Sequence, residues 1–224
     1  ARKGRLADMR DSFHRELESL DQAIVRMGAL VEQSTHRATT ALIECDKELA
    51  QRVRDGDNEI DALFLDVEKR SLVLLAQQAP VAGDLRLIVA ILRSLTDLER
   101  SGDLAYNIAK LSQMEDFRQP ELKAVRALVA EMGRAAAKVM AAAIDAWAAK
   151  DERMAAGIAA EDDVLDELHA RLIEKLVELK GEDSLAPAIR LAMIGRYLER
   201  IGDHAVNIGE RLRYFLTGDE EHLS

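Results

Sequence analysis

The sequence predicts an all-α fold of two tandem antiparallel three-helix bundles, related to each other by internal duplication. The first observation is a repeat: residues 98–108 (LERSGDLAYNI) return one hundred positions later at 198–208 (LERIGDHAVNI). The second is composition, because 4% of the residues are aromatic, three are prolines, and helix-forming Ala, Leu, Glu, Arg and Lys dominate. The third is periodicity, since apolar residues recur every three or four positions and no segment alternates convincingly as a strand would.

The apolar rhythm of the first half predicts three helices, over residues 8–54, 57–78 and 83–115. The first is expected to break near Asp46 and to end at Gly56, because glycine is common just past a helix end. Pro80 separates the second helix from the third, because a proline cannot continue a helix.

The second half repeats this plan, with helices predicted over residues 120–149 (with a short extension to about 159), 161–180 and 184–216. Pro120 marks the boundary between the halves, and Gly181 is expected to end the fifth helix. Pro187 lies near the start of the last helix, where proline is tolerated. We therefore expect two domains, residues 1–116 and 117–224.

Charge and cysteine content exclude several classes of protein. The net charge of −10 argues against nucleic-acid binding, which needs a basic surface, and favours a protein that holds cations or meets a basic partner. No apolar run approaches 18 residues, so no membrane-spanning helix is expected, and the basic start lacks the apolar stretch of a signal peptide. The single cysteine, Cys45, excludes an internal disulfide and is expected to be a small core residue of a protein in a reducing compartment.

Each half carries two pairs of acids spaced four residues apart: Asp57/Asp61 and Glu99/Asp103 in the first, Asp162/Asp166 and Glu199/Asp203 in the second. Residues at this spacing advance only about 40° around a helix and so form one ridge. On the helical wheel the ridge of Glu99 falls in line with apolar Ile88, Leu92 and Leu95, on the stripe expected to face the core. If the second and third helices of each half are antiparallel neighbours, their four carboxylates meet.

Four converging carboxylates repel one another and must be protonated, paired with Arg or Lys, or bridged by metal. Oxygen ligands suit Mg, Ca and Mn, and carboxylate clusters also hold iron or zinc. Two simpler readings remain open: solvated acid pairs, and capping of helix starts by Asp57 and Asp162. Both acid pairs recur in both halves, which neither reading requires, so a shared metal-binding role is a hypothesis that the spacing supports.

Three further residues are candidate auxiliary ligands: Asn107 and Asn207 continue the ridges, and His169 lies on the Asp162/Asp166 face. His204 is offset from its ridge and is expected to face outwards. No Glu-x-x-His motif, phosphate-binding glycine loop or nucleophile motif is found, so no catalytic residue and no organic cofactor site are predicted. A carboxylate-bridged di-metal enzyme on a helical bundle stays as an alternative.

Four phrases together carry a family resemblance: residues 78–86 (QAPVAGDLR), 97–103 (DLERSGD), 197–208 (YLERIGDHAVNI) and the ending TGD at 217–219 followed by EHL at 221–223. Over essentially its whole length the chain resembles the PhoU family, the accessory regulators of the phosphate-specific ABC transport system. The resemblance implies two three-helix bundles in tandem whose acidic motifs hold multinuclear iron or zinc clusters. In this sequence those motifs fall on the eight acids named above.

The resemblance also implies a function. Family members act as cytoplasmic negative regulators of phosphate uptake and of the phosphate-starvation response. We expect a homodimeric, non-enzymatic adaptor between the transporter's ATPase subunit and a membrane sensor histidine kinase, peripheral at the inner face of the membrane through these partners. An accessory role with a different phosphate transporter is the alternative within this class.

Overall fold

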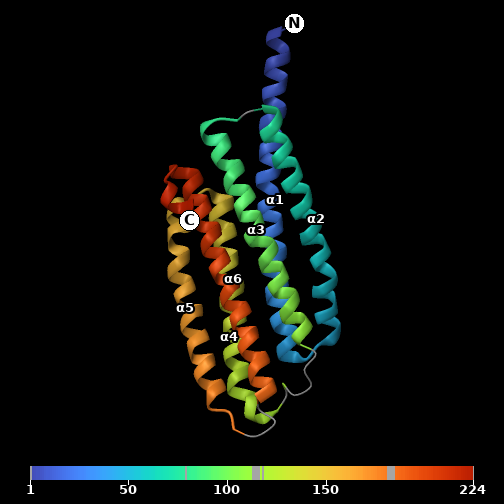
Figure 1. The fold of residues 1–224 in the computed structure, drawn as a ribbon, viewed down its shortest axis with the longest axis vertical. Coiled ribbons are helices and arrows are strands. Elements are labelled where there is room, and N and C mark those ends of the chain that lie inside the picture. The colour runs from blue at the N-terminus through green and yellow to red at the C-terminus, as the bar shows by residue number, and fades with distance from the viewer. Residues whose placement is uncertain (1, 79, 113–116, 118, 181–184, 224) are drawn as a thin grey trace.

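The described residues form six long α-helices and no strand, which confirms the all-α prediction (Figure 1). In this computed structural model the described residues are 2–78, 80–112, 117, 119–180 and 185–223. The helices are α1 (Arg2–Glu44), α2 (Lys47–Gln78), α3 (Ala82–Leu111), α4 (Lys123–Ala149), α5 (Glu152–Val177) and α6 (Leu185–Thr217). A 3-10 turn, η2 (Pro120–Leu122), precedes α4, and another, η4 (Glu220–Leu223), follows α6.

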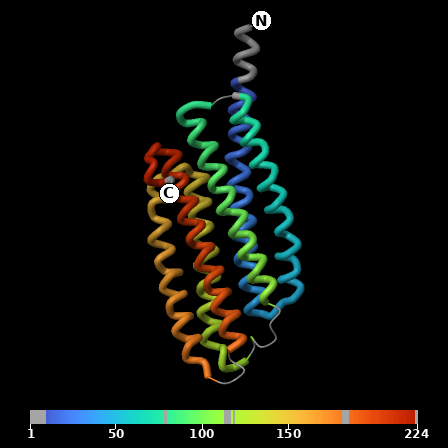
Figure 2. Tube along the Cα trace, in the orientation of Figure 1, coloured from blue at the N-terminus to red at the C-terminus, as the bar shows by residue number. Residues whose placement is uncertain are grey.

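The helices pack as two groups of three in the predicted manner. Helices α1, α2 and α3 contact one another, as do α4, α5 and α6, and the two groups meet where α3 packs on α6 and α1 on α4. Figures 1 and 2 show α2, α3, α6 and α5 side by side, with α1 and α4 behind them. The chain thus has a four-helix front layer and a two-helix back layer.

One continuous core joins the two groups. It contains side chains that are fully shielded from solvent in both halves, among them Ile24, Leu98, Trp147 and Leu198. The predicted domain boundary between residues 116 and 117 falls at the edge of 113–116, which lie outside the described residues, as does the expected helix stop at Gly181.

The predicted break near Asp46 is confirmed, because α1 ends at Glu44 and α2 begins at Lys47, but the predicted starts of the second and fifth helices are wrong. Helix α2 begins at Lys47 and α5 at Glu152, about ten residues earlier than expected, so Gly56 lies inside α2 and ends nothing. The start of each helix is capped by an aspartate. The Asp46 carboxylate accepts the N–H of Leu49 at 2.9 Å, and the Asp151 carboxylate accepts two N–H groups at the start of α5.

The turns after α1 and α4 are also built from the same backbone geometry. Cys45 and Lys150 adopt left-handed conformations, with φ of 54° and 52°. The next N–H reaches back five residues in each case, from Asp46 to the Ala41 carbonyl at 2.9 Å and from Asp151 to the Ala146 carbonyl at 3.2 Å. These bonds satisfy carbonyls that a helix end leaves unpaired. Cys45 is therefore a half-buried turn residue, not the helical core residue that the sequence suggested.

Polar contacts of Asp21 tie α4 to α1. The carboxylate of Asp21 accepts hydrogen bonds from the indole N–H of Trp147 at 2.9 Å and from the Lys150 ammonium at 2.5 Å. The Lys150 nitrogen also lies 4.8 Å from the centre of the Trp147 ring. The turn between α4 and α5 is thus bound to the first helix of the chain.

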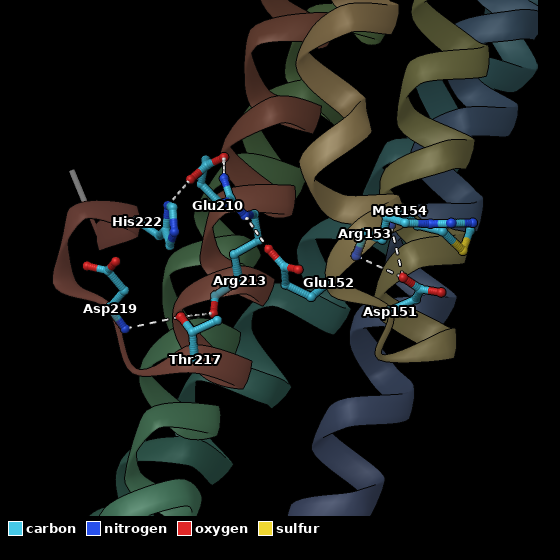
Figure 3. Close-up of polar contacts among 9 residues, drawn as sticks. All are labelled: Asp151, Glu152, Arg153, Met154, Glu210, Arg213, Thr217, Asp219 and His222. Carbon is cyan, nitrogen blue, oxygen red and sulfur yellow. Dashed lines mark hydrogen bonds and ion pairs between the residues drawn. The ribbon is translucent and has the colours of Figure 1, made fainter.

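The end of the chain is bound to the second bundle through a chain of charges (Figure 3). His222 pairs with Glu210 of α6, and Arg213 donates both to Glu210 at 3.0 Å and to Glu152 of α5 at 3.2 Å. Across the interface between the halves, Arg86 of α3 donates to the Phe215 carbonyl at 3.2 Å. Among the described residues no helix is both long and apolar enough to cross a membrane.

Candidate functional site

The acids of the first half meet between α2 and α3. Asp57 and Asp61 lie on α2, and Glu99 and Asp103 on α3; we call these four the first cluster. The pKa of Asp57 is raised to about 6, first by burial and then by repulsion from the other three carboxylates. Burial and neighbouring carboxylates also raise the pKa of Glu99 and of Asp103. The Asp57 carboxylate also lies against Gly102, the residue before Asp103, so the two pairs face each other.

The acids of the second half meet in the same way between α5 and α6. The second cluster consists of Asp162 and Asp166 on α5 and Glu199 and Asp203 on α6. Burial, then repulsion from Asp166 and the other acids around it, raises the pKa of Asp162 to about 7. Asp162 and Glu199 are only 8% and 9% exposed. The Oδ1 atom of Asp162 and the Oε2 atom of Glu199 are buried without a hydrogen-bond partner.

A glycine opposite each cluster allows the close approach. A Cβ added at Gly102 would lie 3.3 Å from the Asp57 carboxylate and 3.2 Å from the Ile60 side chain, and a Cβ at Gly202 would overlap the Asp162 carboxylate. The first aspartate of each cluster therefore crosses directly over the glycine of the facing helix. Both glycines therefore permit the helices that carry each cluster to pack closely.

The two simpler interpretations of the acid pairs, helix capping and plain solvation, are wrong. Asp57 and Asp162 lie in the interior of α2 and α5, so they cap no helix start; Asp46 and Asp151 do so instead. Nor are the pairs merely solvated, because the first acid of each pair is half-buried in the first cluster and buried in the second. The remaining readings are protonation, pairing with a basic side chain, and binding of a cation.

The outer acid of each pair opens to solvent on the front layer. Asp61, Asp103, Asp166 and Asp203 are exposed, whereas Asp57, Glu99, Asp162 and Glu199 are half-buried or buried. Since α1 and α4 cover the other side of the layer, both clusters open on the same face, formed by α2, α3, α6 and α5. A cation could therefore reach both clusters from solvent on one side of the molecule.

The donor set fits an oxygen-preferring cation, because it consists of carboxylates, some of them buried with unpartnered oxygens. The side chains are not preassembled, however. Across the described ranges, no three His, Cys, Asp or Glu side chains stand in an arrangement that could hold a metal ion. Cation binding would therefore require the outer carboxylates, which are exposed to solvent, to turn inwards.

The two clusters differ in their basic neighbours. Arg196, one turn before Glu199, donates through Nη1 to the Glu199 Oε1 atom. The equivalent residue of the first half is Thr96, whose hydroxyl donates to the Leu92 carbonyl at 3.4 Å. His169 lies beside the second cluster, and burial, followed by the charge of Arg196, lowers the pKa of its imidazole. The ligand role expected of His169 stays a prediction.

The helices α3 and α6 share a buried polar contact that the sequence did not reveal. His204 is 6% exposed, not outward-facing as expected, and its Nδ1 atom lies 3.1 Å from the Asp97 carboxylate. Asn207 also donates to Asp97, at 3.3 Å. Its amide is thus directed towards α3, while Asn107 is half-buried. The prediction that His204 faces outwards is wrong because a helical wheel of α6 does not show that the first half of the chain packs against this side of the helix.

A signal for the Arg196 contact was present in the sequence. Arg196 and Glu199 are three residues apart, a spacing at which helical side chains are neighbours. For the Asp97 contact the sequence offers one weaker signal. Its equivalent in the second half is Tyr197, so the two halves differ at this position of the repeat.

Comparisons with known proteins agree on one family. The PhoU domain model matches residues 24–112 and 129–212, one copy in each half. The phosphate-specific transport system accessory protein PhoU homolog 2 of Mycobacterium tuberculosis is 35% identical over 210 residues, which cover 94% of this chain and 99% of that protein. The PhoU homolog of Pseudomonas putida is 36% identical over 214 residues, covering 94% and 83%.

Solved structures extend the likeness to the fold. The crystal structure of PhoU from Pseudomonas aeruginosa superposes with a TM-score of 0.86 at 34% identity, covering 92% of this chain and all of that one. The phosphate transport system regulatory protein PhoU from Streptococcus pneumoniae superposes with a TM-score of 0.83 at 30% identity, covering 92% and 98%. These relatives are named as accessory or regulatory proteins rather than as enzymes, in agreement with the non-enzymatic prediction.

Proposed function

Because the chain belongs to the PhoU family of phosphate transport accessory and regulatory proteins, we propose that it is a cytoplasmic negative regulator of phosphate uptake and of the phosphate-starvation response. In this proposal it is a homodimer that binds the ATPase subunit of a phosphate ABC transporter and a membrane sensor histidine kinase. It would lie at the inner face of the membrane through these partners. The single observation that carries the proposal is the family match over 94% of the chain, with one family domain in each half.

The proposal assigns cation binding to the two clusters. What supports it is the donor set: eight carboxylates in two groups of four, held close by Gly102 and Gly202 and partly desolvated. A bound iron or zinc cluster would supply positive charge that neutralises each group and cross-links the two helices that carry it. The chain's own contribution is to hold the four inner acids between the helices and to leave the four outer acids exposed to solvent; the inner acids are Asp57, Glu99, Asp162 and Glu199.

The regulatory role requires a difference in affinity between two partner states, since a protein that binds both states equally shifts neither. The front layer is the surface that we assign to docking, because cation binding would change its charge most. Loading of the clusters would convert strongly acidic patches into nearly neutral ones and so change which partner surface fits.

Metal content is the first test of the cluster assignment. Plasma mass spectrometry of the purified protein should find several equivalents of iron or zinc, lost in the double variant Glu99→Gln/Glu199→Gln. Glu131→Gln, which alters an exposed acid of α4, is the matched control and should retain the metal. Equal metal in all three proteins, or none in any after reconstitution, would refute cation binding at the clusters.

Partner capture tests the adaptor role separately. The tagged protein, recovered from phosphate-replete and phosphate-starved cells, should retain the transporter ATPase and the sensor kinase in different proportions. Capture of a different phosphate transporter would support the alternative accessory role instead. Recovery of no transporter component and no kinase under either condition would refute the adaptor role, whatever the metal content.

A further inference from the structure

The two clusters of this chain share four acids each but are not electrostatically equivalent. In the second cluster the Arg196 guanidinium is paired with Glu199. In the first, Thr96 occupies the corresponding position and bonds the backbone of its own helix. Within the part of the chain that the structure describes, Glu99 has no ion-pair partner; the nearby charge of Arg100 lowers its pKa less than burial and the other acids raise it.

Pairing with Arg196 satisfies only part of the second cluster. Glu199 uses its Oε1 atom for the arginine, while its Oε2 atom and the Oδ1 atom of Asp162 remain buried without a partner. Both residues are about nine-tenths shielded, with 9% and 8% of their surface exposed. Buried carboxylate oxygens without partners are costly, so they favour any cation that reaches them.

Arg196 approaches this buried group from solvent. Its side chain is 53% exposed, whereas that of Glu199 is 12% exposed. Because the guanidinium is half exposed, water can solvate it when the pair breaks, and the cost is about that of one charge-assisted hydrogen bond. The arginine can therefore turn into water without any movement of the helices.

We propose that Arg196 is a built-in counter-ion of the second cluster: its guanidinium competes with a metal ion for Glu199, so the two clusters of one chain bind cations with unequal affinity. The inference rests on the proposed function, in which both clusters bind cations. Its consequence is graded loading, with the first cluster filled at lower cation concentration and the second only when a cation displaces the arginine.

Zinc titration of single-cluster proteins tests the proposal. The second cluster is isolated by Glu99→Gln/Asp103→Asn, and zinc binding to it is measured by calorimetry with and without Arg196→Met. We expect about tenfold tighter binding in the arginine variant, the effect of one lost charge-assisted hydrogen bond. Arg200→Met removes the same charge from an exposed position one residue beyond Glu199 and is expected to change the affinity little.

The reciprocal variant places the competitor in the other cluster. With the second cluster disabled by Glu199→Gln/Asp203→Asn, Thr96→Arg should weaken zinc binding to the first cluster by about tenfold.

Thermal stability without metal gives an independent measurement. In chelator, Arg196→Met should lower the melting temperature, because Glu199 loses its partner, and saturating zinc should raise it more than in the parent protein.

The outcomes separate this inference from the function on which it rests. Zinc binding that Arg196→Met and Arg200→Met strengthen equally would reduce the effect to net charge and overturn the inference. Unchanged binding in Arg196→Met, with the first cluster still binding zinc, would also overturn it and leave the proposed function intact. Absence of zinc binding at both clusters would overturn cation binding itself, and the inference with it.

Discussion

Asp162 is the residue at which burial and repulsion act most strongly. It lies in the middle of α5, over Gly202 of the facing helix, with one oxygen unpartnered. Its pKa of about 7 means that the folded protein binds a proton there that the unfolded chain, with an ordinary value of 3.8, releases much earlier. Folding is therefore favoured when this group is protonated and opposed when it is ionised.

The sign of the pH effect follows directly. In the absence of metal, Asp162 imposes no penalty below about pH 4, and the penalty grows until the pH passes about 7. Asp162→Asn stays neutral, so at pH 7.5 it should be more stable than the parent by up to about 4 kcal/mol, because a pKa raised from 3.8 to about 7 opposes folding by about 1.4 kcal/mol per pH unit between these values. Urea unfolding in chelator at pH 4 and at pH 7.5 measures this. A variant that is equally destabilised at both pH values would contradict the prediction.

Substitution of two glycines by alanine is expected to change the stability of the protein in opposite directions. Gly202→Ala should destabilise the protein by about 1–3 kcal/mol, because the new Cβ overlaps the Asp162 carboxylate and the Leu165 side chain. Gly56 is exposed within α2 and has no neighbour within 4 Å of an added Cβ. Gly56→Ala should therefore stabilise by about 0.5–1 kcal/mol through helix propensity. Denaturant midpoints decide both: an unchanged midpoint in Gly202→Ala would argue against the close approach at Gly202, and loss of stability in Gly56→Ala would argue against the helix-propensity gain.

At the scale of elements, the turns after α1 and α4 explain why helix boundaries were harder to predict than helix number. Glycine inside a helix costs only about 1 kcal/mol, which the packing of a long helix offsets, so Gly56 did not end one. The informative signal was instead Asp46 and its repeat Asp151, because an aspartate at a helix start satisfies free N–H groups. The periodicity of apolar residues therefore predicts that a helix exists, whereas a capping residue such as Asp46 or Asp151 indicates where it begins.

The same turns provide a matched pair of variants. Cys45→Gly should stabilise the protein by about 0.5–1 kcal/mol, since glycine adopts the left-handed backbone without strain. Lys150→Gly relieves the same strain but removes the bond to Asp21 at 2.5 Å and the contact with Trp147, so it should bring no gain or a loss. Thermal melting of the two variants compares them, and an equal gain in both would contradict a stabilising role for the Lys150 anchor.

At the scale of the whole molecule, the fold and the convergence of the acids were predictable because each depends on one half of the chain. A spacing of four residues sets the ridge, and antiparallel neighbours bring two ridges together. What lay beyond prediction depends on contacts between the halves. His204 meets Asp97, about one hundred residues away in sequence, and no periodicity within α6 indicates that partner.

That contact gives a prediction for the interface between the halves. His204→Leu should destabilise by about 3 kcal/mol, because it deprives the buried Asp97 carboxylate of a partner. Asp97→Leu/His204→Leu should cost less than the sum of the single changes, which a double-mutant cycle in urea measures. The exposed Arg26–Glu59 pair, at 2.6 Å, is the control, and Arg26→Ala should cost at most about 1 kcal/mol. Strict additivity at Asp97 and His204 would refute the coupling.

The Asp97–His204 contact also has a geometric consequence for α3 and α6. Two apolar helix faces can pack in more than one register, because leucines and alanines recur along both helices and successive registers bury similar side chains. A slip of one turn, about 5.4 Å, would leave this carboxylate and imidazole among apolar side chains. The polar pair therefore permits a single register, and so keeps the first and second clusters at a constant spacing along the front face.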